Sequence, residues 1–124
     1  VNFKLKDFSK GFGFDENSFG NVYSRLALHY FDDKTTERIF REIKRVVKPG
    51  GAFLMRVKSI HSEKYGKGDK IGKNYYSING HRRHFFSKKY VREKVQGFGI
   101  RALKYSKRPN SSEKEFLDLM AISK

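Results

Sequence analysis

Hydrophobic residues recur with a helical period after residue 33, and a shorter apolar run flanks this segment on each side. One apolar stripe of an amphipathic helix is formed by Ile39, Phe40, Ile43, Val46 and Val47. We expect Asp33 to cap this helix, Pro49 to end it and Gly50-Gly51 to turn the chain back. The flanking runs, residues 22–26 and 52–57, are expected to be strands. Strand, helix and strand in this order predict a βαβ unit whose two strands are parallel.

The rest of the chain adds weaker patterns to this unit. Alternating apolar and polar residues predict a strand over residues 1–8, and a polar, glycine-rich stretch predicts a loop over 9–18. Residues 59–80 are rich in lysine and glycine and lack a period, which predicts a long loop of the lid or binding type. Ser87 is expected to cap a second helix that ends near residue 96. Two antiparallel strands are expected near residues 98–105 and 116–122. The sequence therefore predicts a single α/β domain with a mostly parallel sheet and an antiparallel C-terminal strand.

The chain carries 28 Lys and Arg against 13 Asp and Glu, a net charge of +15. This charge favours nucleic acid or other acidic partners, although a solvated lysine-rich surface explains it equally well. The absence of cysteine excludes disulfides, thiolate metal sites and a cysteine nucleophile within this chain, and it favours a reducing, cytoplasmic location. No apolar run approaches the ~18 residues of a membrane span. Because the sequence opens with Val1 rather than Met, we expect a fragment of a longer protein.

Two segments at a fixed spacing resemble a known family. Residues 17–31 contain a strand that leads into an apolar-apolar-His segment, and about fifteen residues later Val47-Lys48-Pro49-Gly50-Gly51 joins a helix to the next strand. This combination is similar to the class I S-adenosylmethionine-dependent methyltransferases. Arg83-His84-Phe85-Phe86-Ser87 and the terminal strand pair resemble later parts of the same Rossmann-like fold. The resemblance implies S-adenosyl-L-methionine as cofactor, and it extends from the family's third strand to its end.

The chain departs from the family pattern at the cofactor loop. The glycine-rich loop after the family's first strand is absent, and so is the acidic residue that ends its second strand. Neither Gly11-Phe12-Gly13 nor Gly97-Phe98-Gly99 replaces the loop, because the first lies in a loop and the second follows a helix. The resemblance therefore implies an incomplete fold without its first two strands, and we expect the isolated chain to be inactive. The strand at residues 22–26 is then expected to expose an edge that permits self-association.

The resemblance also implies candidate cofactor contacts. Asp7 and Phe8 correspond to the family's adenine site, and the alternative is an ordinary strand-terminal aspartate bonded to a turn. Ser24, Arg25 and Leu26 correspond to the end of the fourth strand, where the backbone meets the methionine part of the cofactor. Open sheets bind ligands beyond the carboxyl ends of their strands, which favours the same position. The alternative is a strand end that only packs in the core.

Histidines and tyrosines supply further candidates. His29 is a candidate catalytic residue, although a packed, hydrogen-bonded histidine is the commoner role. Candidate substrate contacts are Tyr30, Tyr75 and Tyr76. His81 and His84 have a spacing compatible with metal ligands, but no third ligand lies nearby in the sequence, so we predict no metal site. Basic and aromatic residues alternate between residues 67 and 92, which fits either nucleic-acid binding or a lid over small substrates, as in the family.

The implied activity is in-line transfer of a methyl group from a sulfonium to a nucleophile, in which alignment supplies most of the catalysis. Methylation of cytosine C5 through a cysteine is excluded within this chain. Ser24-Arg25-Leu26-Ala27 occupies the position where enzymes that methylate base amino groups carry Asn/Asp-Pro-Pro-Tyr/Phe. A small-molecule acceptor is therefore the first hypothesis, and RNA is the second. A hypothesis of another class is a non-catalytic basic α/β module that binds RNA or a partner chain.

Overall fold

The computed structural model describes residues 15–26 and 28–124. The strand predicted over residues 1–8, with Asp7 and Phe8, lies outside the described residues, as does the Gly11-Phe12-Gly13 segment.

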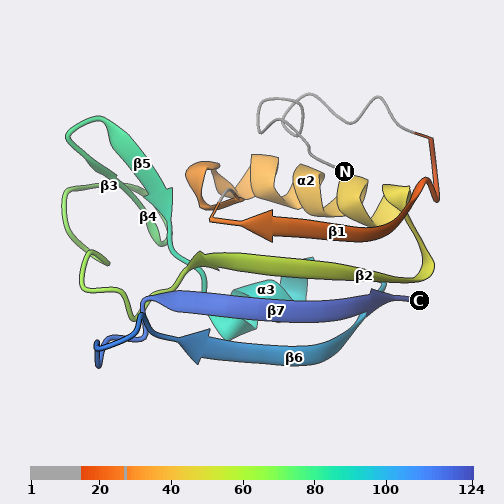
Figure 1. The fold of residues 1–124 in the computed structure, drawn as a ribbon. Coiled ribbons are helices and arrows are strands. Elements are labelled where there is room, and N and C mark those ends of the chain that lie inside the picture. The colour runs from red at the N-terminus through yellow and green to blue at the C-terminus, as the bar shows by residue number, and fades with distance from the viewer. Residues whose placement is uncertain (1–14, 27) are drawn as a thin grey trace.

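The predicted βαβ unit is confirmed (Figure 1). It consists of β1 (Phe19–Arg25), the short 3-10 helix η1 (Leu28–Tyr30), α2 (Asp33–Val46) and β2 (Val47–Lys58). β1 and β2 are parallel, and Val22 lies opposite Phe53. The predicted N-cap was wrong by one residue. Asp32 caps α2, because its side chain accepts a hydrogen bond from the Thr35 N–H at 2.8 Å.

The turn after α2 also differs from the prediction, because the helix ends at Val46 and β2 begins at the next residue. The pairing of β1 with β2 is interrupted between Phe19 and Asn21, so the intervening part of β2 bulges. Gly50 lies in this bulge with a φ of +82°, which favours glycine. At Gly51 the backbone of β1 approaches so closely that a side chain would overlap the carbonyl oxygen of Gly20.

Among the described residues, four strands form the main sheet in the order β1-β2-β7-β6. β6 (Phe98–Ser106) and β7 (Phe116–Ser123) confirm the two predicted C-terminal strands and their antiparallel pairing. β7 is antiparallel to β2 as well, so β1, β2 and β6 run in one direction and β7 in the other. The predicted α/β class with an antiparallel C-terminal strand is therefore confirmed; three of the four described strands of this sheet run in one direction, although the pairing is parallel between β1 and β2 and antiparallel at β7.

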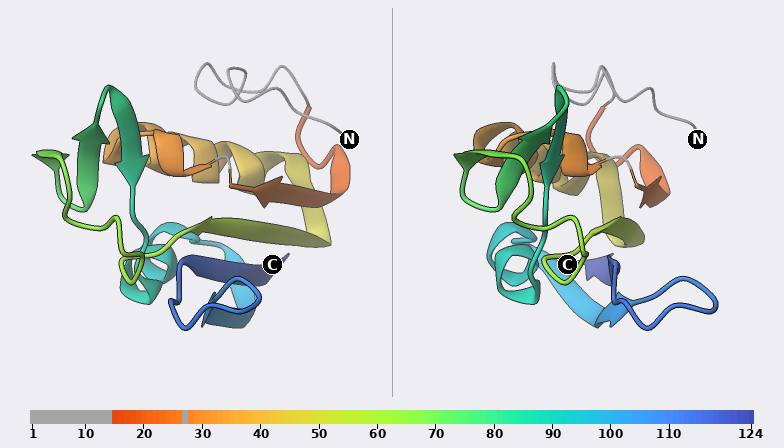
Figure 2. Two further views of the ribbon diagram at one scale, coloured as in Figure 1. Left: turned by 60° about the vertical axis from the view of Figure 1, so that its left-hand side comes forward. Right: turned by 90° about the vertical axis from the view of Figure 1, so that its left-hand side faces the viewer.

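α2 and α3 (Lys88–Lys94) cover the same face of this sheet (Figure 2). All five residues of the predicted apolar stripe are buried in one core with Phe53, Met55 and Leu119. Ser87 caps α3, as predicted, by accepting a hydrogen bond from the Tyr90 N–H. The opposite face carries exposed apolar side chains, including Tyr23 with 65% of its surface accessible.

The prediction of a long loop over residues 59–80 was wrong. This region contains β3 (Asp69–Gly72) and β4 (Tyr75–Ile78), which form a separate three-stranded antiparallel sheet with β5 (His81–His84). Figure 1 shows this insertion sheet at the carboxyl ends of β1 and β2. Each of its strands has four residues, too few to display a clear alternation. The turn between β4 and β5 is Asn79-Gly80, with φ values of +51° and +81°, the pair that favours a tight hairpin.

Candidate functional site

The candidate cofactor contacts lie at the carboxyl end of β1, and their side chains diverge. Ser24 is buried on the face that packs against the helices, and its Oγ has no hydrogen-bond partner among the described residues. Arg25 is exposed and, by strand alternation, lies on the opposite face. Leu26 has a left-handed φ of +55°, and its N–H donates to the carbonyl oxygen of Arg56 at 2.8 Å. Because the side chains of Ser24 and Arg25 lie on opposite faces, a ligand at this edge can meet both residues only through their main chain.

His29 is the middle residue of η1 and is buried, with 2% of its surface exposed. Its Nδ1 accepts a hydrogen bond from the Lys58 N–H at 3.4 Å, so the neutral ring carries its proton on Nε2. Burial, together with the positive charges of Arg83 and Lys58, lowers the pKa of His29 to about 3. A ring that is this hard to protonate and whose Nδ1 already accepts a hydrogen bond is a weak general base. The geometry favours a packing role.

His84 is the second buried histidine near this edge, and 2% of its surface is exposed. Burial lowers the pKa of His84 to about 4, against the opposing effect of the Asp33 carboxylate. Its ring packs against the rings of Phe86 and Tyr90, each with centroids 4.8 Å away. Its Nδ1 has no hydrogen-bond partner in the part of the chain that the structure describes. His81, its predicted partner in a ligand-like spacing, is exposed.

The structure shows no group of three metal-ligating side chains among the residues it describes, and none of its described helices could span a membrane.

The three candidate substrate tyrosines take different positions. The Tyr75 hydroxyl donates to the carbonyl oxygen of Tyr30 at 3.5 Å, which connects the insertion sheet to η1. The Tyr30 ring is partly exposed and lies beneath the guanidinium of Arg83, 4.6 Å from the ring centroid. Tyr75 and Tyr76 are consecutive residues of β4, so their side chains lie on opposite faces of the insertion sheet. The structure therefore brings Tyr75 and Tyr30 together and directs Tyr76 elsewhere.

A groove of about 810 Å³ lies between the insertion sheet, the start of α2 and α3. Its apolar and aromatic wall consists of Ile71, Tyr75, His84 and Tyr90. Across the groove the Tyr90 hydroxyl donates to Asp33 Oδ1 at 2.6 Å, and this hydrogen bond lowers the pKa of the Asp33 carboxyl. Lys94 lies 3.4 Å from the same carboxylate oxygen. Sequence reasoning missed Asp33, Tyr90 and Lys94 as groove residues, because residues 33 and 90 meet only through the tertiary fold.

Cations from three elements also line the groove: Lys34 of α2, Lys73 of the β3–β4 turn and Arg82 of β5. None of the three forms an ion pair within residues 15–26 and 28–124. The groove can therefore offer unpaired positive charge to an anionic group beside an aromatic wall.

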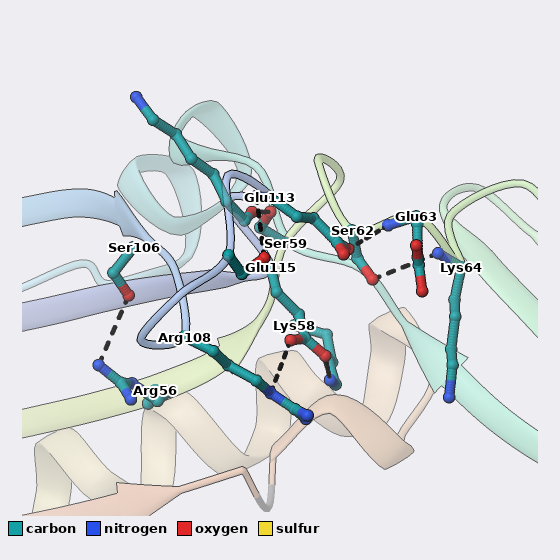
Figure 3. A network of polar contacts seen from close by, with 12 residues as sticks. Arg56, Lys58, Ser59, Ser62, Glu63, Lys64, Ser106, Arg108, Glu113 and Glu115 are labelled. Atoms are coloured by element: carbon teal, nitrogen blue, oxygen red, sulfur yellow. Dashed lines mark hydrogen bonds and ion pairs between the residues drawn. The ribbon is translucent and has the colours of Figure 1, made fainter.

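A polar network fixes the strand ends from which the insertion departs (Figure 3). Arg56 of β2 binds both carboxylate oxygens of Asp118 of β7, at 2.7 and 3.0 Å. Glu115 pairs with Lys58 and, at 2.8 Å, with Arg108. A two-point contact between planar groups restricts orientation as well as distance. The end of β2 and the start of β7 are thus held together where the chain leaves for the insertion sheet.

Comparison with known proteins identifies what this architecture is similar to. Residues 1–55 match the family model of a methyltransferase domain. No curated protein matches the chain. Among solved structures, the PH0226 protein from Pyrococcus horikoshii OT3 is 17% identical with a TM-score of 0.72, and 94% of this chain covers 57% of that one. An S-adenosylmethionine-dependent methyltransferase from Methanosarcina mazei is 18% identical with a TM-score of 0.73, and 93% of this chain covers 64% of that one.

A third similar structure is the 1,6-didemethyltoxoflavin-N1-methyltransferase of Burkholderia thailandensis with bound 1,6-didemethyltoxoflavin and S-adenosylhomocysteine. It is 16% identical with a TM-score of 0.70, and 94% of this chain covers 48% of it. At these identities the likeness shows the fold. The chain spans roughly half to two thirds of the length of these three proteins.

Proposed function

We propose that this chain binds the methyl acceptor in a class I S-adenosylmethionine-dependent methyltransferase and that the acceptor is a small molecule. The chain has the fold of these enzymes over part of their length. The groove is the observation that carries the proposal. It is lined by the insertion sheet, which lies at the carboxyl ends of β1 and β2 (Figure 1), and its volume of about 810 Å³ suits a small organic ligand. Its connection to η1 through Tyr75 and Tyr30 links acceptor binding to the end of β1.

The residues at the end of β1 fit one part of the cofactor. The main chain at Leu26 is fixed by its hydrogen bond to Arg56, which suits backbone contacts to the methionine part of S-adenosyl-L-methionine. The described residues contain no glycine-rich loop from strand into helix, so the contacts to the rest of the cofactor would come from elsewhere in the longer protein. When bound, S-adenosyl-L-methionine supplies a methyl group on a sulfonium that needs no further activation.

The chain's own residues then hold and orient the acceptor. Tyr75, His84 and Tyr90 form a wall that excludes water from one side of the acceptor. Lys34, Lys73 and Arg82 would bind a carboxylate or phosphate on it, because they lack other partners in the described part of the chain. Holding the nucleophile in line with the methyl group supplies most of the rate gain in such a transfer. His29 would support this edge by packing, with its Nδ1 occupied by Lys58.

The experiment uses the full-length protein that contains this chain, methyl-labelled S-adenosyl-L-methionine and a cell extract separated into small-molecule, RNA and protein fractions. We expect label in the small-molecule fraction. Tyr75→Leu should lower kcat/KM for the labelled acceptor at least tenfold, whereas Tyr76→Leu, on the other face of the same strand, should change it less than about threefold. Label confined to RNA would contradict the small-molecule acceptor, and label in no fraction would contradict methyl transfer.

A further inference from the structure

The insertion sheet has a second face, which the groove does not use. Directly paired residues of neighbouring strands lie on the same face. Lys70 of β3 pairs with Tyr76 of β4, which pairs with Arg83 of β5, so these three side chains form one row across the sheet. The groove is lined by Ile71, Tyr75, Arg82 and His84, the alternate residues of the same three strands. The row therefore lies on the face turned away from the groove.

The row continues to η1 as an alternation of cations and aromatic rings. The Arg83 guanidinium lies over the ring of Tyr30, 4.6 Å from its centroid. We call Lys70, Tyr76, Arg83 and Tyr30 the basic-aromatic strip. Tyr30 is 38% exposed, and Lys70 is exposed as well. The strip thus begins beside the end of β1 and crosses to the outer strand of the insertion sheet.

The Tyr76 ring of the strip packs against two neighbouring aromatic rings. The ring of Tyr76 meets the rings of Tyr65 and Phe85 edge to face, with centroids 5.6 and 6.2 Å away. Phe85 is buried, whereas Tyr65 is 37% exposed and its hydroxyl donates to Asn74 Oδ1 at 2.5 Å. These contacts hold the Tyr76 ring in place and leave it partly exposed, so a ligand that stacks on its exposed part orders few side chains on binding.

The charge of the strip is not neutralised. Between residues 61 and 84 there are six Lys and Arg against two Asp and Glu. Neither Lys70 nor Arg83 forms an ion pair with any residue that the structure describes. Neighbouring strands lie about 4.8 Å apart, which puts the backbones of Lys70 and Arg83 roughly 10 Å apart with Tyr76 between them. That spacing leaves room for one base on the tyrosine ring between two phosphate contacts.

We propose that the basic-aromatic strip binds single-stranded nucleic acid, with phosphates on Lys70 and Arg83 and a base stacked on Tyr76. Aromatic rings on an open sheet accept unpaired bases of any sequence, whereas bases in a duplex are already stacked. An acidic peptide would use the two cations and leave the ring unused. This binding needs no methyl donor and is independent of the proposed function.

The test measures fluorescence anisotropy of a labelled twelve-nucleotide oligouridine with this chain over a range of KCl concentrations. Lys70→Gln/Arg83→Gln should weaken binding at least tenfold and reduce the slope of log K against log salt by about 1.4, since each phosphate contact on a single strand contributes about 0.7. The matched control is Lys48→Gln/Arg101→Gln, which removes the same charge from exposed residues elsewhere on the main sheet and should weaken binding less than threefold. Circular dichroism checks that each variant is folded.

Stacking has its own readout. Tyr76→Leu should weaken binding at least fivefold without changing the salt slope, because base–aromatic stacking contributes about 1–3 kcal/mol per base. The chain contains no tryptophan, so Tyr76→Trp introduces a single indole, whose fluorescence should be quenched by oligouridine and not by polyglutamate. Equal weakening by the two charge-removing pairs, or an unquenched indole, would overturn the proposal. Binding to phosphatidylserine vesicles without binding to oligouridine would also overturn it, in favour of a membrane surface.

Discussion

The two buried histidines should make the fold sensitive to mild acid. The pKa of His29 is lowered to about 3 and that of His84 to about 4, mainly by burial, whereas an unfolded histidine has a pKa of 6.5. Below pH 6.5 these two histidines are therefore protonated in the unfolded chain but remain neutral in the folded chain. The stability contributed by the neutral rings is complete above this pH and is lost as the pH falls towards the folded pKa values.

The size of the effect follows from the two pKa values. Between pH 7.5 and 5.5 the contribution of each histidine to the free energy of unfolding falls by about 1.3 kcal/mol. The pair therefore accounts for a loss of about 2.6 kcal/mol, a large part of a small domain's stability. The carboxyls of Asp33 and Asp118 do not contribute to the change over this pH range. The pKa values of Asp33 and Asp118 are lowered from 3.8, so their contribution is lost only at more acidic pH.

The assay is urea unfolding of this chain, followed by far-ultraviolet circular dichroism at several pH values from 7.5 to 5.5. His29→Asn preserves an acceptor for the Lys58 N–H, and His84→Phe preserves an aromatic ring between Phe86 and Tyr90. The double variant should lose most of the acid sensitivity, whereas His81→Gln, at an exposed position, should retain it. A wild-type loss below about 0.5 kcal/mol, or an equal loss in the double variant, would refute the reasoning.

Three further predictions concern the framework of the site. Gly51→Ala should destabilise the fold by about 1–3 kcal/mol, because its methyl group would meet the Gly20 carbonyl, whereas Gly20→Ala, with open space around the new methyl, should be nearly neutral; urea midpoints compare the two. Asp118→Asn should cost about 1–2 kcal/mol by weakening the two-point contact with Arg56, and an unchanged midpoint would contradict a bracing role. Tyr90→Phe should raise the pKa of the Asp33 carboxyl towards its ordinary value, measured by carbon-13 NMR, and a pKa that stays low would assign the shift to Lys94.

The central βαβ unit could be predicted from the sequence because its information is local. Ile39, Phe40 and Ile43 are spaced for one helix face, and that spacing alone fixes which side of α2 is buried. The cap was misplaced because Asp32 and Asp33 are adjacent and both suit an N-cap, so only the backbone geometry distinguishes them.

The insertion sheet and the groove were not predicted, for different reasons. The insertion strands are short and largely polar, although Asn79-Gly80 carried a hairpin signal that could have revealed β4 and β5. The groove depends on contacts between distant segments, such as Tyr90 with Asp33, which no local pattern records. The roles of Ser24, Arg25, Leu26 and His29 stay predictions, as do those of Asp7 and Phe8 outside the described residues.

Calorimetric titration with S-adenosylhomocysteine tests the central claim most directly, with the full-length protein and this 124-residue chain measured side by side. Our account predicts a micromolar dissociation constant for the full-length protein and no detectable heat for the isolated chain, which lacks the glycine-rich loop within its described residues. Absence of binding to the full-length protein would contradict the proposal that it is a methyltransferase. Micromolar binding to the isolated chain would contradict our view that its cofactor site is incomplete.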